Sequence, residues 1–154
     1  MLFIFLNILF ATSIEEVGRS AFDFFSIGHV CFGIGTLLVF SIFYTIPIHQ
    51  GNKPIMPLWL VYTLTLIVLI AWEFIENIVF FELGWKFENR LDSPINITTD
   101  IILGALGAAV NGYFAYKMVE LDKNMKGYYI FGIISFIVWI LLFVIFRQIA
   151  YLVY

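Results

Sequence analysis

The sequence predicts an all-α protein, a polytopic integral membrane helix bundle of four to five transmembrane helices. Of its 154 residues, 62% are hydrophobic and only 12% are charged, whereas soluble domains average about 45–50% apolar and about 25% charged residues. The mean hydropathy of +1.00 agrees with this class. Apolar stretches of about 20 residues, the length that crosses roughly 30 Å of hydrocarbon, also follow one another along the chain.

A single transmembrane domain is expected over residues 1–154, with spans at about 24–46, 57–81, 95–118 and 128–151. Proline and glycine residues between 47 and 57 separate the first two spans, and a polar turn separates the last two. Ser93 is expected to cap the third span, with Pro94 in its first turn. Residues 1–12 are apolar but short, so we expect an interfacial helix or an additional partial span there.

The polar residues of this apolar chain are concentrated near the ends of three spans. They follow Gly28 at the start of the first span, Trp72 near the end of the second, and Arg90 just before the third. If the helices alternate in direction, these three span ends meet at the same face of the membrane. Helical spacing supports convergence, because Glu73, Glu76 and Asn77 share one helix face.

Ionisable side chains cost about 2.5 kcal/mol or more at mid-bilayer, so they tend to face inward and to mark function. Carboxylates and a histidine can ligate a divalent metal or share a proton during acid–base catalysis. An arginine beside them suits a phosphate or carboxylate head group. The catalytic candidates, which are also the candidate metal ligands, are therefore His29, Glu73, Glu76 and Asp100. The candidate substrate-binding residues are Asn77, Arg90, Asp92, Ser93 and Asn96.

The motif resembles that of a family of small bacterial integral membrane proteins. The pattern is Gly28-His29, Trp72-Glu73-x-x-Glu76-Asn77, Arg90, and Asp92-Ser93-x-x-Asn96-x-x-x-Asp100 with glycines following. More loosely it resembles the VanZ-like proteins, a family named for a teicoplanin-resistance protein. The chain departs from that pattern at Asn77, where a glutamine is expected, and in the order of Asp and Asn in the third span. The resemblance implies a multi-helix membrane fold and no particular reaction.

Three function classes remain open at this point. The leading hypothesis is a membrane-embedded hydrolase or transferase acting on lipid or isoprenoid-linked head groups, with a divalent metal ion as cofactor. The alternatives are a small oligomeric carrier or binding protein for an ion or amphiphile, which would be a homo-oligomer, and a structural membrane subunit. Membrane lipids are the expected partners. The net charge of −3 and the lack of a basic stripe argue against nucleic acid.

The loop charges predict an orientation in the cell membrane. With alternating spans, lysines at 53, 117, 123 and 126 lie on one side, and Arg19, Lys86, Arg90 and Arg147 lie on the other. Arg90 belongs to the polar motif and Arg147 to the last apolar stretch, so we leave both out of the count. The side with the four lysines then carries more positive charge. Because cytoplasmic loops are enriched in Lys and Arg, we expect the polar site on the extracytoplasmic side.

Overall fold

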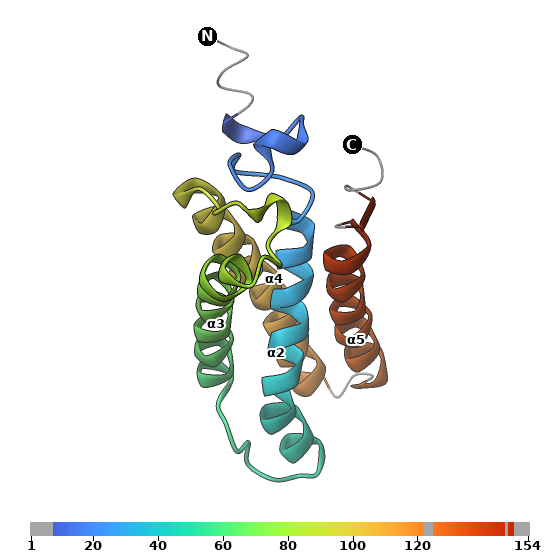
Figure 1. Ribbon diagram of the computed structural model, residues 1–154. Coiled ribbons are helices and arrows are strands. Elements are labelled where there is room, and N and C mark those ends of the chain that lie inside the picture. The colour runs from blue at the N-terminus through green and yellow to red at the C-terminus, as the bar shows by residue number, and fades with distance from the viewer. Residues whose placement is uncertain (1–7, 122–124, 147, 150–154) are drawn as a thin grey trace.

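The computed structural model of the chain is a bundle of four long helices (Figure 1), and it describes residues 8–121, 125–146 and 148–149. Within this part of the chain, four helices are long and apolar enough to cross a membrane. The all-α membrane-bundle prediction is therefore confirmed. The elements follow one another in the order η1 (Ile14–Glu16), α2 (Ser26–His49), α3 (Leu58–Phe74), η2 (Ile75–Phe80), η3 (Phe87–Asn89), α4 (Pro94–Glu120), α5 (Met125–Leu141) and η4 (Leu142–Phe146).

Two of the four spans change their helical geometry near one end. α3 continues into η2, and α5 continues into η4, and both continuations are π-helical. The third span begins as the sequence predicts, because the Ser93 side chain accepts a hydrogen bond from the Asn96 N–H and Pro94 occupies the first turn. The predicted end of the fourth span at 151 lies outside the described residues.

The N-terminal segment lies across the end of the bundle at which α2 and α4 begin (Figure 1). Its described part is tied to the residues just before α2, because the Ala11 N–H donates to the Phe22 carbonyl and the Phe22 N–H donates to the Leu9 carbonyl. Most of the predicted interfacial or partial span at 1–12 falls on residues 1–7, outside the described part of the chain.

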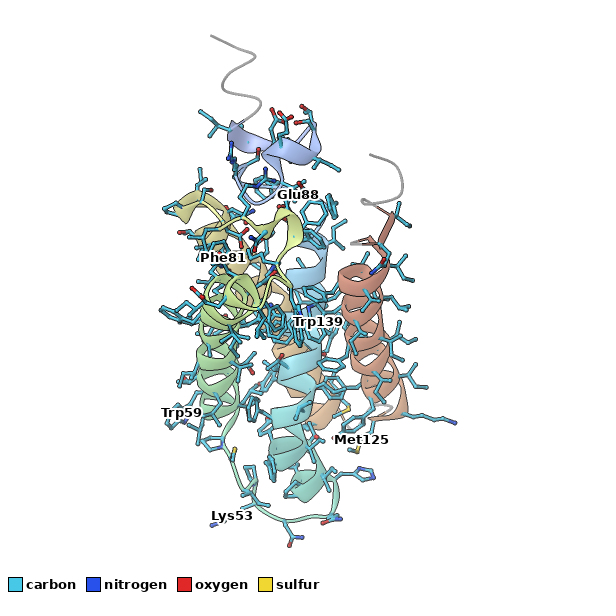
Figure 2. The ribbon with its side chains drawn as sticks, viewed as in Figure 1. Lys53, Trp59, Phe81, Glu88, Met125 and Trp139 are labelled. Carbon is cyan, nitrogen blue, oxygen red and sulfur yellow. The ribbon has the colours of Figure 1, made fainter. Side chains whose placement is uncertain are left out.

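α2 is the central helix of the bundle, and it packs against each of the other three spans. Most of its side chains are buried, whereas α3 and α5 turn many apolar side chains outward, among them Ile67 and Ile133, which are 56% and 51% exposed. Outward-facing apolar side chains on long helices are what a lipid-facing surface requires. Figure 2 shows these outward side chains, with Lys53 at the end of the bundle opposite Glu88.

α2 and α4 approach each other closely because glycines line their interface. Gly33 faces the main chain of Gly104, and Gly107 faces the main chain of Val30. Small residues at such spacing allow the backbones of membrane helices to meet. The side-chain amide of Asn111 also donates to the Ile34 carbonyl across this interface, at 2.8 Å. The close approach holds the beginnings of α2 and α4, which carry His29 and Asp100, next to each other.

We expect Gly33→Ala to destabilise the bundle. The new methyl group would overlap the Gly104 carbonyl, and overpacking of this kind typically costs about 1–3 kcal/mol. Thermal unfolding of the detergent-purified protein measures the effect. Gly112→Ala on α4 is the control, because its methyl group would lie 3.6 Å from Leu37 Cδ1, an ordinary contact. Equal unfolding temperatures for the two variants would contradict the proposed close packing.

Candidate functional site

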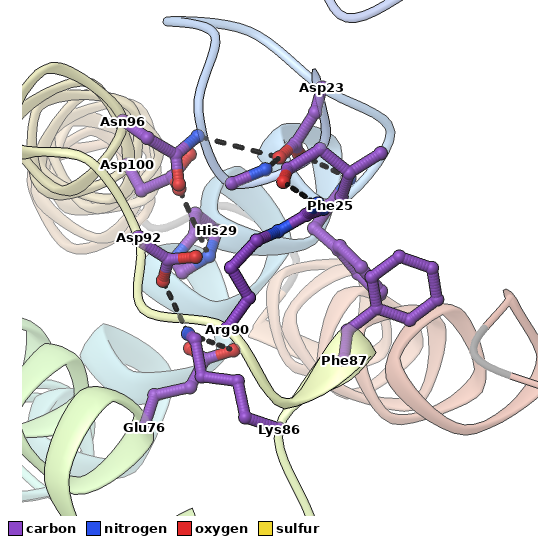
Figure 3. A pocket seen from close by; sticks show the side chains of 12 residues that line it. Asp23, Phe25, His29, Glu76, Lys86, Phe87, Arg90, Asp92, Asn96 and Asp100 are labelled. Atoms are coloured by element: carbon purple, nitrogen blue, oxygen red, sulfur yellow. Dashed lines mark hydrogen bonds and ion pairs between the residues drawn. The ribbon is translucent and has the colours of Figure 1, made fainter. Parts of the chain in front are cut away.

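A polar cavity lies at the end of the bundle where α2 and α4 begin and α3 ends (Figure 3). Its volume is about 20 Å³, counted as space for the centre of a water-sized sphere, which is room for about one water molecule or ion. Four separate segments of the chain contribute to it. The lining residues are Val17, Gly18, Asp23, Phe25, His29, Glu76, Lys86, Phe87, Arg90, Asp92, Asn96 and Asp100.

His29 lies between two buried carboxyl groups, one from α3 and one from α4. Its Nδ1 is 3.4 Å from Glu73 Oε1, and its Nε2 is 3.6 Å from Asp100 Oδ2. Both distances are longer than a normal N–H···O hydrogen bond. The imidazole therefore has one nitrogen facing each carboxyl group. This arrangement joins the three spans α2, α3 and α4 at one residue.

Three of the four predicted metal-ligand candidates form a compact group. One ligand atom from each of His29, Glu73 and Glu76 lies within 4.8 Å of the others. Two ligands that are each about 2.1 Å from a tetrahedral ion are about 3.4 Å apart, which matches the separation of 3.4 Å between His29 Nδ1 and Glu73 Oε1. The distance between this pair therefore fits two ligands of a small divalent cation, and one Glu76 carboxylate oxygen lies within 4.8 Å of both.

Asp100 contacts the imidazole from the other side and does not belong to this three-residue group. Its Oδ1 accepts a hydrogen bond from the Ser26 hydroxyl at 3.2 Å, which leaves Oδ2 facing His29 Nε2. Metal-binding histidines commonly donate their second ring N–H to a carboxylate, which fixes the tautomer and the ring orientation. Asp100 is placed for this orienting contact, with the lone pair of Nδ1 then facing Glu73.

Asn77 and the loop after it fix the position of the two glutamates. The Asn77 side chain donates to the Glu73 carbonyl at 3.1 Å and accepts from the Asp92 N–H at 2.9 Å. Glu76 lies within the π-helical segment η2. π-Helical turns occur frequently at functional sites, and this one sets the orientation of Glu76. The predicted substrate contacts of Asn77 and Asp92 remain predictions.

Lys86 is a site residue that the sequence analysis missed. It belongs to the loop after η2, yet only 5% of its surface is exposed. Its ammonium group is 3.6 Å from Glu76 Oε1 and also contacts Asp92 Oδ2 (Figure 3). A buried lysine needs an ionic partner, and here it has two. The available signal was a lysine ten residues after Glu76 and six before Asp92.

Asp23 is the second residue that sequence reasoning missed. Its carboxylate accepts hydrogen bonds from the N–H groups of Gly18, Phe25 and Ser26, at 2.9, 2.8 and 3.2 Å. The side-chain amide of Asn96 lies 3.4 Å from it. The signal for this arrangement is the Asp-x-x-Ser spacing before α2, because the Asp23 N–H also donates to the Ser26 hydroxyl. Burial raises the pKa of the Asp23 carboxyl, and the backbone N–H groups oppose that rise.

The raised pKa of Asp23 makes the stability of the protein pH-dependent. Between the ordinary pKa of about 3.8 and the raised value, the folded state binds more protons at this group than the unfolded state. The free energy of unfolding contributed by Asp23 therefore falls as the pH rises through that window. We expect Asp23→Asn to remove the contribution of Asp23 to the dependence of the unfolding free energy on pH. Unfolding measured between pH 3.5 and 7 tests it, with Glu82→Gln on an exposed carboxyl as the control; equal slopes for wild type and Asp23→Asn would contradict it.

Arg90 holds the N-terminal segment over the cavity. Its Nη2 donates to the carbonyls of Ile14 and Val17, at 2.8 and 2.9 Å. The start of α4 assists, because the Ser93 N–H donates to the Gly18 carbonyl at 2.7 Å and the Asn96 side chain donates to the Ser20 carbonyl at 3.0 Å. The three predicted substrate-binding residues Arg90, Ser93 and Asn96 thus bind the chain's own backbone, and they form a cover on the water side of the site.

We expect Arg90→Ala to loosen this cover while leaving the four spans folded. Two charge-assisted hydrogen bonds would be lost, each worth about 1.5–3 kcal/mol. Backbone amides at residues 8–22 should then exchange hydrogen about tenfold faster or more. Hydrogen exchange read by mass spectrometry measures this, and Arg19→Ala is the control because the Arg19 side chain is exposed. Unchanged exchange at these amides in Arg90→Ala would show that Arg90 does not hold the cover.

The site carries more acidic than basic groups. Around the cavity, five carboxyl groups meet two cationic side chains, Lys86 and Arg90; the carboxyl groups belong to Asp23, Glu73, Glu76, Asp92 and Asp100. Fully ionised, with a neutral histidine, this part of the structure would hold an excess of three negative charges. Buried charge of one sign is costly unless it is paired. A bound cation at this part of the structure would offset part of the excess.

The fold and the site together define a multi-pass membrane protein with a buried histidine–carboxylate cluster near one end of its spans. Comparison of the chain with protein-family models, with curated proteins and with solved structures found no match.

Proposed function

We propose that the protein is a membrane-embedded hydrolase or transferase that binds a divalent cation between His29, Glu73 and Glu76 and acts on a phosphate-bearing lipid or isoprenoid head group. The observation that carries the proposal is the cluster of these three ligands inside a site with excess negative charge. A divalent cation satisfies both the geometry and the charge. When bound, it would supply Lewis-acid polarisation of a phosphoryl oxygen.

The chain's own residues suit the remaining tasks. The Lys86 ammonium lies at the cavity beside Glu76 and Asp92, where it would attract an anionic head group and stabilise negative charge that develops on it. The Asp100 carboxyl orients the imidazole of His29. The cover held by Arg90 keeps bulk water from the cavity, which strengthens electrostatic interactions inside.

The location in the cell membrane, with the site on the extracytoplasmic side, is part of the proposal. Lys86 is buried in ion pairs and Arg90 is bonded to backbone carbonyls, so neither acts as an ordinary loop charge. Excluding them strengthens the positive-inside argument that places the opposite loops in the cytoplasm. The motif's resemblance to VanZ-like proteins agrees with a membrane site and does not name the reaction.

A carrier function has one observation in its favour. Hydroxyl groups are buried along the other half of α2, where the Tyr128 hydroxyl donates to Ser41 Oγ at 2.7 Å and the Thr45 and Tyr129 hydroxyls are 2.5 Å apart. These groups could belong to a polar path. However, the seven residue steps from His29 to Thr36 span about 10 Å of helix, and Phe32, Gly33 and Ile34 lie within that interval. We therefore prefer the enzyme proposal.

Metal-dependent turnover tests the proposed function. Protein in phosphatidylcholine nanodiscs is incubated with polyprenyl monophosphate or diphosphate and with Mg²⁺, Mn²⁺ or Zn²⁺, and released phosphate or transferred head group is measured. We expect turnover that stops with a chelator and falls at least about 100-fold in Glu76→Gln. His49→Gln, at the opposite end of α2, is the matched control. Turnover that does not depend on metal, or no turnover of any lipid phosphate by metal-loaded protein, would overturn the proposal.

A further inference from the structure

A second cavity adjoins the polar one and shares two of its residues. His29 and Glu76 line both cavities. The second has a volume of about 10 Å³, counted as space for the centre of a water-sized sphere, and the rest of its lining is almost entirely apolar: Phe25, Gly28, Trp72, Trp139, Leu142 and Phe143. It lies between the α3–η2 span and the α5–η4 span. The catalytic cluster is therefore bordered by an apolar, aromatic space on one side.

Aromatic rings, rather than close helix packing, fill the space between these two spans. The Trp72 ring centroid is 5.1 Å from that of Trp139 and 6.2 Å from that of Phe143. Phe32 of α2 lies behind them, with its ring stacked on Trp139 at 4.5 Å. Figure 2 marks the position of Trp139 within the bundle. Side-chain rotations can open such a wall without moving the helices apart.

Both spans are π-helical where they border this space. η2 supplies Glu76 on one side, and η4 supplies Leu142 and Phe143 on the other. π-Helical turns are rare and occur frequently at functional sites. Two of them facing one small cavity are an observation independent of the carboxylate cluster. They point to this gap as a working part of the site.

The N-terminal segment lies over the water side of the polar cavity, and the gap between the two spans approaches the same cavity from the membrane. Arg90 fastens residues 14–17 over the polar cavity, and Ser93 fastens Gly18. Any ligand whose tail stays in the bilayer must leave the cavity sideways. Past the shared residues His29 and Glu76, the adjoining space is lined by apolar side chains, which suit a hydrocarbon chain and not a head group.

We propose that the gap between η2 and η4 is a lateral entrance that, when its ring side chains rotate, holds the head-proximal part of one apolar chain of a membrane amphiphile while its anionic head group lies at the mouth of the polar cavity. This inference rests on the proposed function and names its substrate class: a single-chain, isoprenoid-type lipid phosphate drawn from the bilayer. In the structure this space has room for about one water molecule, so its ring side chains must rotate to admit a lipid, and a single chain requires a smaller opening than the two chains of a glycerophospholipid. Trp72, Trp139 and Phe143 form the gate.

Photolabelling tests the entrance. The probe is farnesyl monophosphate with a diazirine on its first isoprene unit, added to the full chain in phosphatidylcholine nanodiscs with Mn²⁺. We expect saturable labelling of Trp139, Phe143 or Trp72, removed by excess unlabelled farnesyl monophosphate, and unsaturable labelling at the lipid-facing Ile133. Gly28→Leu would fill the cavity and should reduce gate labelling at least about tenfold. Gly28→Ala is the matched control, because its methyl group would lie 3.7 Å from Trp139 Cδ1.

The outcomes separate the entrance from the metal function, because Mn²⁺ binding is measured on the same samples. The entrance is supported if Gly28→Leu loses labelling of the gate residues but still binds Mn²⁺. If the protein binds Mn²⁺ but the probe labels it only without saturation, the proposed entrance is wrong and the proposed metal site is retained. Saturable gate labelling without Mn²⁺ binding overturns the metal function and keeps a lipid site. If Gly28→Leu does not fold, Phe143→Ala replaces it: this variant should widen the gap and speed labelling of Trp139, and slower or unchanged labelling would overturn the entrance.

Discussion

Lys86→Met is expected to destabilise the metal-free protein by about 3–5 kcal/mol, because breaking a buried ion pair leaves its partner charges uncompensated. Here the uncompensated groups are Glu76 and Asp92. The same change should raise the affinity for a divalent cation about tenfold or more, since a positive charge that repels the cation at close range is removed. The variant should therefore be unstable when metal-free and rescued by metal.

Thermal unfolding with and without Mn²⁺, together with a Mn²⁺ titration, measures both effects. Lys53→Met is the matched control, because Lys53 is an exposed lysine at the opposite end of the bundle (Figure 2). We expect a larger metal-induced rise in unfolding temperature for Lys86→Met than for wild type or the control. Weaker metal binding in Lys86→Met would instead show that the ammonium group helps to build the site rather than competing with the cation.

The second large effect is a loss of divalent-cation affinity when either carboxyl partner of His29, Glu73 or Asp100, is replaced, and the loss should differ between the two. Glu73→Gln removes a ligand and should lower divalent-cation affinity by more than about 100-fold. Asp100→Asn keeps an acceptor for the ring N–H of His29, and changes to such outer contacts typically cost about 10–100-fold in metal affinity. Competition with a fluorescent chelator measures both constants in detergent. Equal losses would contradict the assignment of Glu73 as ligand and Asp100 as an orienting residue.

The general fold and the meeting of the polar segments could be predicted because both depend on simple periodicities. Apolar runs of about 20 residues give spans, and alternation of the spans brings His29, Glu73 and Asp100 to one end. The i, i+3 spacing correctly placed Glu73 and Glu76 on one side of the helix. The close approach of α2 and α4 likewise depends on residue type, because Gly33 faces the main chain of Gly104.

The parts that sequence reasoning missed depend on loop conformation. Lys86 reaches the cavity only because the loop after η2 folds back over the bundle, and no helical spacing encodes that. The contacts of Arg90 with the carbonyls of Ile14 and Val17 also depend on the loop, because these residues lie more than 70 positions earlier in the chain; the anion contact of Arg90 remains a prediction. The sequence analysis likewise did not predict the π-helical segment that contains Glu76.

Metal content is the most direct test of the central claim that His29, Glu73 and Glu76 hold a divalent cation. Wild type and Glu73→Gln are purified in detergent, dialysed against Mn²⁺ or Zn²⁺ and then against metal-free buffer, and analysed by elemental mass spectrometry, with folded yield recorded for each. The account predicts about one ion per wild-type chain and almost none in Glu73→Gln that remains folded. No ion in well-folded wild-type protein, with Glu73→Gln misfolded, would contradict it and would show that the cluster is an ion-pair network that holds the helices together.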